Sequence, residues 1–121
     1  MISLILLAYL LAPRIPVPVQ AQAMTVVATA YTSNDPGCNE ITATGRRTRY
    51  PDGRHKPGIA VDPRVIKLGS RVSLDGGKSW LLADDVGGSI KGRRIDVRMA
   101  SRHKAITFGR RKIVILVRRK R

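Results

Sequence analysis

Short runs of apolar and β-branched residues, separated by turn signals, make up most of the chain. Runs of this kind with partial period-two alternation are typical of half-buried strands. They occupy residues 25–32, 58–61, 71–74, 79–84, 94–99 and 112–117. Gly, Pro and Asp stand between them at the positions where tight turns form. Six short strands predict an all-β fold, a small six-stranded barrel that closes when the first strand pairs with the last.

Two of these strands have patterns that predict which side chains are buried. In residues 94–99 the apolar side chains fall on one face, and Arg94, Asp96 and Arg98 fall on the other. Residues 112–117 read KIVILV, and every residue after the first lysine is apolar. A continuous run of this kind predicts burial on both faces.

One short helix is expected, over residues 101–108. Ser101 provides an N-cap side chain, and Gly109 can take the left-handed conformation that commonly ends a helix. No other segment of the chain shows these signals together.

The chain begins with an apolar run over residues 2–12, followed by a Pro-rich stretch. The run is shorter than the roughly 20 residues that span a bilayer, and it suits the hydrophobic region of a signal peptide. The small residues Ala21 and Ala23 provide a cleavage site before Met24. We therefore expect a signal peptide over 1–23, a barrel domain over 24–117 and a basic tail over 118–121. An apolar arm packed on the domain is the alternative for residues 1–23.

Charge narrows the choice of partner. The chain has 23 Lys and Arg against 8 Asp and Glu, a net charge of +15. This balance favours a polyanionic partner, which could be nucleic acid, an acidic membrane surface or an anionic cell-wall polymer. Aromatic residues make up only 4%, which argues against a base-stacking platform. One Cys and two distant His give no metal site, and nothing indicates a cofactor.

The few acidic residues are candidates for chemistry. Three of them adjoin Pro or Gly and are expected in turns: Asp35, Asp52 and Asp75. Asp62 and Asp85 lie where a strand gives way to a turn, and there they could instead cap the turn. Asp96 lies inside a strand, where carboxylates are depleted. Carboxylates held together raise the pKa of one of them, and a protonated carboxyl is the general acid for glycosidic cleavage. Salt bridges to the many cations are the alternative reading.

Five ordered motifs over residues 25–117 resemble those of the 3D (three-aspartate) domain family. They are ATAYT, TATG, IAVDPRVIKLGSRVSL, LADDVGGSIKGRRIDV and AITFGRRKIVILV. The DVGGSIKG block, with an Asp eleven residues after its own, is also similar to the catalytic barrel of membrane-bound lytic transglycosylase A. The resemblance implies a six-stranded double-psi β-barrel and cell-wall remodelling activity.

The resemblance also implies roles for individual residues. The three aspartates of the family map to Asp62, Asp85 and Asp96, with Asp96 as acid and base and Asp85 as its supporting carboxylate. It further implies five residues that bind substrate. Tyr31 and Thr44 would line the glycan groove, Gly87 and Gly88 would allow close approach of a sugar, and Lys91 would lie at the edge of the groove.

The implied reaction is non-hydrolytic cleavage of the β-1,4 bond between N-acetylmuramic acid and N-acetylglucosamine, leaving a 1,6-anhydromuramyl end. The expected partner is the peptidoglycan glycan strand in the cell wall, the periplasm or the extracellular space, with anionic wall polymers as a further one. A non-catalytic wall-binding module is the first rival. A nucleic-acid binder is the second, and export and the few aromatics count against it.

Overall fold

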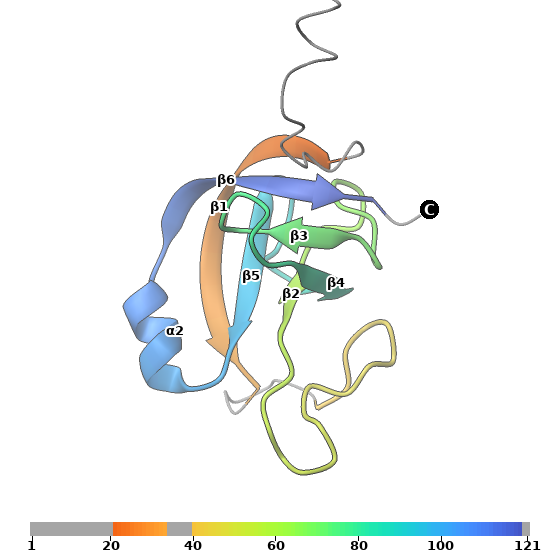
Figure 1. The fold of residues 1–121 in the computed structure, drawn as a ribbon, viewed down its shortest axis with the longest axis vertical. Coiled ribbons are helices and arrows are strands. Elements are labelled where there is room, and N and C mark those ends of the chain that lie inside the picture. The colour runs from red at the N-terminus through yellow and green to blue at the C-terminus, as the bar shows by residue number, and fades with distance from the viewer. Residues whose placement is uncertain (1–20, 34–39, 120–121) are drawn as a thin grey trace, which may run out of the picture.

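The computed structural model describes residues 21–33 and 40–119. Its strands close into a barrel in the order β1-β5-β2-β4-β3-β6 (Figure 1). Strands β1 and β5 pair in parallel, as do β2 and β4, and the other four pairings are antiparallel. The strands are β1 (Ala21–Thr32), β2 (Gly58–Ala60), β3 (Arg71–Ser73), β4 (Leu81–Asp85), β5 (Arg94–Met99) and β6 (Arg111–Arg118). The expected all-β fold, a small six-stranded barrel with one short helix, is confirmed.

The first and last strands of the barrel pair with each other, as the sequence predicts. The antiparallel register runs from Ala21 opposite Arg118 to Ala28 opposite Arg111. Strand β1 starts three residues before Met24, because the ladder to β6 continues past the expected cleavage point. Residues 1–20 lie outside the described residues, so the signal peptide stays a prediction.

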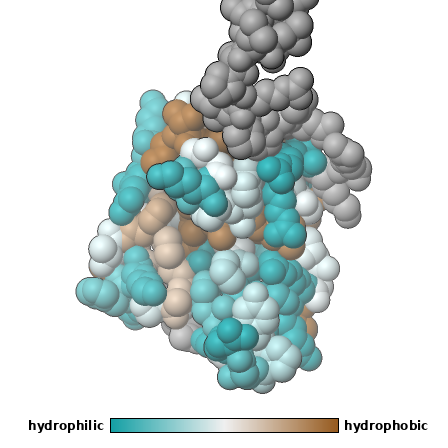
Figure 2. All heavy atoms as spheres, in the orientation of Figure 1, coloured by the Kyte–Doolittle hydropathy of each residue, from teal (hydrophilic) through white to brown (hydrophobic). Residues whose placement is uncertain are grey.

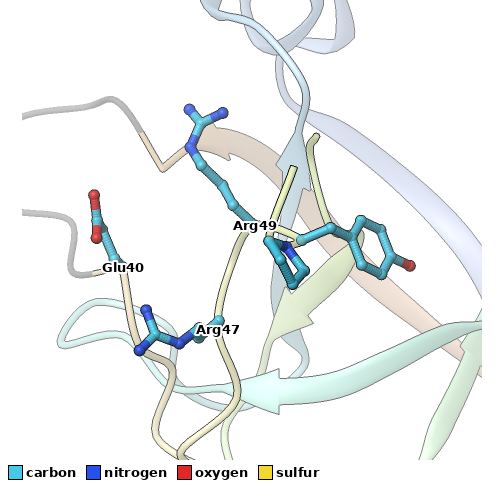
Figure 3. Close-up of a pocket in the computed structure, with 5 residues that line it drawn as sticks. Glu40, Arg47 and Arg49 are labelled. Carbon is cyan, nitrogen blue, oxygen red and sulfur yellow. The ribbon is translucent and has the colours of Figure 1, made fainter. Parts of the chain in front are cut away.

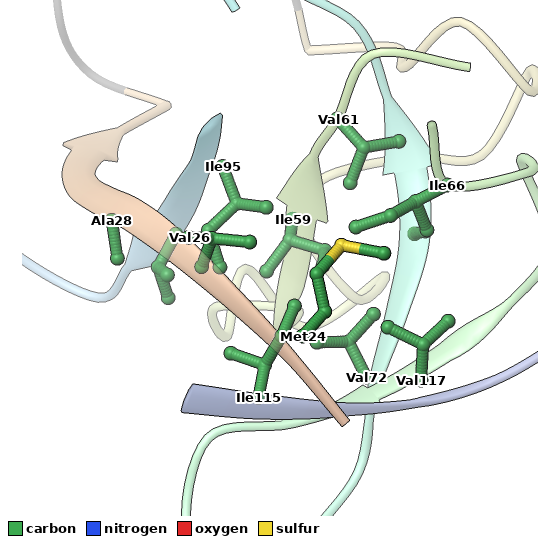
Figure 4. Packing of buried hydrophobic residues seen from close by; sticks show 12 residues of the cluster. Met24, Val26, Ala28, Ile59, Val61, Ile66, Val72, Ile95, Ile115 and Val117 are labelled. Carbon is green, nitrogen blue, oxygen red and sulfur yellow. The ribbon is translucent and has the colours of Figure 1, made fainter. Parts of the chain in front are cut away.

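The core fills the barrel with aliphatic side chains from every strand (Figure 4). Ile59, Ile95 and Ile115 are fully buried. The expectation that residues 112–117 are buried on both faces is wrong, because Val114 is 62% exposed while its neighbour Ile115 is 0% exposed. Strand β6 alternates between the core and the outer face of the barrel, and the outer face is open to solvent at Val114.

The helix α2 (Arg102–Phe108) connects β5 to β6 and lies against β1 and β5 (Figure 1). The Ser101 side chain accepts a hydrogen bond from the Lys104 amide, and Gly109 ends the helix with φ of 65° and donates to the Ala105 carbonyl. Both predicted helix ends are therefore confirmed. In the described part of the chain, we find no helix that is long and apolar enough to cross a membrane.

A long loop over residues 40–57 lies between β1 and β2 and covers one part of the outer barrel face. Two isolated bridges, Ile41 with Arg47 and Arg49 with His55, give it local order. The loop lies at the bottom of Figure 1, and hydrophilic side chains cover the same area in Figure 2. Polar groups of the adjoining strands are thereby buried under a polar loop.

Candidate functional site

Two of the three predicted catalytic aspartates flank one small residue on the barrel wall. Ala60 of β2 pairs with Asp85 of β4 on one side and with Asp96 of β5 on the other. The register between β2 and β4 shifts between Ile59 and Ala60, so the face of Asp85 follows from its hydrogen bond with Tyr31, a residue that β1 presents on the same side as Asp96. Neighbouring strands lie about 4.8 Å apart. The two aspartate backbones are therefore separated by about 10 Å across a floor formed by Ala60.

Asp96 lies on the outer face of β5, as the alternation of this strand predicts. The Thr29 hydroxyl, directly opposite on β1, donates a 3.0 Å hydrogen bond to Asp96 Oδ1. The Asp96 side chain is half-buried. Sequence reasoning missed Thr29, although the alternation of β1 places it on the same face as the predicted site residue Tyr31.

Asp85 is held as a hydrogen-bond acceptor at the end of β4. Its Oδ1 accepts from the backbone amides of Ala43 at 3.1 Å and Val86 at 2.9 Å. Its Oδ2 accepts from the Tyr31 hydroxyl at 3.4 Å. These three hydrogen bonds fix the position of the Asp85 carboxyl group.

Tyr31 lies between Asp85 and the side chain of Arg98. Burial raises the pKa of Tyr31 to about 12, although Arg98 acts in the opposite direction. The phenol is therefore protonated at neutral pH and can donate to Asp85. Arg98 Nη1 in turn donates to the Tyr31 oxygen at 3.1 Å.

Beside this site lies a buried ion pair that the sequence does not indicate. Arg98 and Asp84 are both fully buried, with Nη2 to Oδ2 at 2.6 Å and Nη1 to Oδ1 at 3.1 Å. Arg46 from the covering loop adds a contact of 2.9 Å to Asp84 Oδ2. The alternation of β5 places Arg98 on the outer face with Asp96, and the 40–57 loop then shields it from water.

The third aspartate, Asp62, has a different environment. Its side chain is 2% exposed, and its two oxygens accept from the backbone and guanidinium of Arg64 and from the Gly92 amide at 2.8 Å. Hydrogen bonds from Arg64 and then from Gly92 hold the pKa of Asp62 well below its usual range. Asp62 therefore joins the turn after β2 to the segment that enters β5.

Thr44 lies in a tight turn against the end of β4. Its amide donates to the Asp84 carbonyl at 3.2 Å, and its hydroxyl lies 3.0 Å from that of Thr42. Gly45 follows with φ of 81°, a conformation that favours glycine. The structure thus brings Thr44 and Asp85 to the same end of β4.

The remaining predicted binding residues belong to the loop between β4 and β5. A Cβ on Gly87 would lie 2.8 Å from Ile90 Cγ1, so this glycine permits the turn to pack on its own core residue. A Cβ on Gly88 would meet no atom within 4 Å, and Lys91 is exposed. Contact of these three residues with a sugar stays a prediction.

A separate open hollow of about 340 Å³ lies in the 40–57 loop (Figure 3). The residues that line it are Glu40, Arg47, Arg49, Tyr50 and Pro51. The cationic groups of Arg54 and Lys56 lie 5.1 and 5.3 Å from the centre of the Tyr50 ring. None of the site residues predicted from the sequence lines this hollow.

Across residues 21–33 and 40–119, no group of three or more His, Cys, Asp or Glu side chains is placed to hold a metal ion. Asp35 and Cys38 lie outside the described residues.

The comparisons with known proteins agree with the motifs. The model of the 3D domain matches residues 58–117. Three proteins of Bacillus subtilis (strain 168) are similar: "Cell wall-binding protein YocH" is 42% identical over 80% of this chain, "Putative cell wall shaping protein YabE" 38% over 79%, and "SPbeta prophage-derived uncharacterized protein YorM" 45% over 73%. The matches span only 33%, 23% and 39% of those proteins. By its fold, its aspartates and this match, the chain belongs to the 3D domain family.

Proposed function

We propose that the chain is an exported lytic transglycosylase that cleaves the β-1,4 bond between N-acetylmuramic acid and N-acetylglucosamine in peptidoglycan. The observation that carries the proposal is the placement of Asp85 and Asp96 on either side of Ala60, on one face of the barrel. The names of two relatives, one cell wall-binding and one cell wall shaping, support peptidoglycan as the substrate.

In this mechanism Asp96 acts first as acid and then as base. The protonated carboxyl gives its proton to the glycosidic oxygen, and the bond from that oxygen to C1 of the muramyl residue breaks. The substrate's own N-acetyl group stabilises the positive charge that develops at C1. The Asp96 carboxylate then takes the proton of the C6 hydroxyl as its oxygen bonds to C1, which closes the 1,6-anhydro ring and restores the acid.

Three neighbouring residues support Asp96 in this mechanism. The Thr29 hydroxyl orients the Asp96 carboxylate through its 3.0 Å hydrogen bond. Asp85, which accepts hydrogen bonds from two backbone amides and from the Tyr31 hydroxyl, is the supporting carboxylate on the other side of Ala60. Asp62, whose oxygens accept hydrogen bonds from Arg64 and Gly92, positions the loop that leads into β5.

The groove would be lined by Tyr31 and Thr44, with Gly87 and Gly88 allowing close approach of a sugar and Lys91 at its edge. The net charge of +15 would attract the anionic wall and speed encounter, without selecting the bond that is cleaved.

The test is mass spectrometry of the muropeptides released from purified peptidoglycan by the protein and by Asp96→Asn. Asp52→Asn is the matched control, since Asp52 is exposed and its carboxylate contacts only the adjacent turn. We expect anhydromuramyl products from the wild type and from Asp52→Asn, and none from Asp96→Asn. Products with reducing ends would instead indicate a hydrolase acting at the same site.

A non-catalytic wall-binding module is the second candidate, and the relative named as a cell wall-binding protein is the observation that favours it. It predicts that the protein sediments with purified sacculi and releases no soluble fragments. It further predicts that Asp96→Asn binds sacculi as well as the wild type does.

A further inference from the structure

The buried ion pair of Arg98 and Asp84 lies beside the proposed active site, since Arg98 follows Asp96 by two residues on β5 and Asp84 adjoins Asp85 on β4. The guanidinium of Arg98 is engaged on every side: Nε donates to the Lys56 carbonyl at 2.9 Å, and Nη1 and Nη2 reach the Asp84 carboxylate. Such a two-point pair fixes the plane of the guanidinium as well as its position. Within this fixed plane, Arg98 Nη1 also donates a 3.1 Å hydrogen bond to Tyr31 Oη.

The chemistry of these groups gives the hydrogen-bond chain one direction. An arginine only donates, so the Tyr31 oxygen must accept from Arg98. The single phenolic proton then remains for the other neighbour of that oxygen, Asp85 Oδ2 at 3.4 Å. A chain therefore runs from the buried pair through Tyr31 to the carboxylate beside Ala60.

The backbone makes room for this pair at a glycine. Gly58 of β2 is paired with Arg98 in the sheet. A Cβ at Gly58 would lie 2.1 Å from Arg98 Nη2 and 2.6 Å from Asp84 Oδ2. A glycine is therefore needed here for packing against the ion pair, and not for a special backbone angle.

We propose that Arg98, held by Asp84, is a positioning residue that fixes the Tyr31 hydroxyl and, through it, the Asp85 carboxylate in the glycan groove. The proposal rests on the proposed function for its effect on the reaction. The hydrogen-bond chain itself can be tested without any substrate.

The first experiment is NMR of protein labelled with ¹³C at the tyrosine Cζ, a position that responds to hydrogen bonding at the hydroxyl. Tyr31→Phe assigns the Tyr31 resonance. Arg98→Lys keeps the charge but loses the planar fork, and we expect it to shift this resonance. Arg110→Gln, an exposed arginine, is the matched control and should leave the resonance in place. An unshifted Tyr31 resonance in Arg98→Lys overturns the proposal, whatever the activity.

The second experiment compares the rate of anhydromuramyl release with binding to sacculi. For Arg98→Lys we expect release to fall by about tenfold to a hundredfold, with binding and the folded NMR spectrum retained. Gly58→Ala displaces the pair without removing a polar group and should lower release in the same way, at a temperature at which its NMR spectrum shows the folded protein. A shifted Tyr31 resonance with unchanged release overturns the positioning role.

Failure of the proposed function gives a different pattern. If the wild type releases no fragments, the enzyme proposal falls, and sacculus binding becomes the readout. A positioning role in the groove then requires weaker binding by Arg98→Lys than by Arg110→Gln, and equal binding overturns it.

Discussion

The substitution Gly58→Ala adds a single methyl group to the barrel and should destabilise it strongly. The new Cβ would lie 2.1 Å from Arg98 Nη2 and 2.7 Å from Asp84 Oδ1, whereas ordinary contacts begin near 3.4 Å. The ion pair must therefore move by more than 1 Å or separate. Neither side chain has space to move freely, because both are fully buried.

The expected loss follows from the two processes that such a movement involves. Overpacking a close-packed interior costs about 1–3 kcal/mol, and breaking a buried pair costs about 3–5 kcal/mol. Arg46 remains beside Asp84 and the Lys56 carbonyl beside Arg98, so the pair is not left wholly without partners. We therefore expect a loss near the overlap of the two ranges, about 3 kcal/mol.

Urea unfolding followed by the fluorescence of Trp80, with thermal unfolding beside it, measures this loss. In a domain of this size about 3 kcal/mol corresponds to roughly 12–24 °C in melting temperature. Gly88→Ala is the matched control, because its Cβ would meet no atom within 4 Å and its φ is not positive. A Gly58→Ala protein within about 0.5 kcal/mol of the wild type would refute the packing argument.

Three further results follow from single contacts. The pKa of Asp75 is lowered from 3.8 to about 2, first by the Ser79 hydroxyl, so its stabilising contribution is complete above about pH 4 and is lost as the pH falls towards 2. Asp75→Asn should therefore lose less stability than the wild type between pH 4 and 2 in acid unfolding curves, and an unchanged slope would contradict this. Ile115→Ala should lower the free energy of unfolding by about 2–5 kcal/mol, and Val114→Ala, on the exposed face, by less than about 1 kcal/mol; equal losses in urea would reject the described orientation of β6. Thr29→Val removes the hydroxyl that orients the proposed acid, so product release should fall about tenfold while stability changes by about 1 kcal/mol. Unchanged release would exclude a role for this hydroxyl.

Local signals in the sequence predicted much of the fold. The cap residues Ser101 and Gly109 gave both ends of α2, because each signal acts within one helical turn. The alternation of β5 correctly placed Asp96 on the outer face. The ordered motifs predicted that Asp85 and Asp96 act together, and both residues pair with Ala60 in the barrel. The spacing of the motifs alone says nothing of strand β2, which lies between the two aspartates.

The features that the sequence did not predict depend on contacts between distant segments. Arg98 reads as a solvated strand residue, and its burial follows only from the loop that carries Arg46 and Lys56 over it. The prediction that β6 is buried on both faces was wrong, since a continuous apolar pattern cannot show that the outer barrel face is exposed to solvent at Val114. Strand β1 begins before Met24 because β6 provides partners for it, and no local pattern encodes that pairing.

The pairing of β1 with β6 also bears on the order in which the molecule is assembled. Ala21 and Arg118 meet in the ladder although 97 positions separate them in the chain. Contacts between such distant residues slow folding, because the entropy of closing the long loop is lost before the contacts form. A newly made chain therefore holds β1 without its β6 partner until that strand is synthesised, and only then can the barrel close.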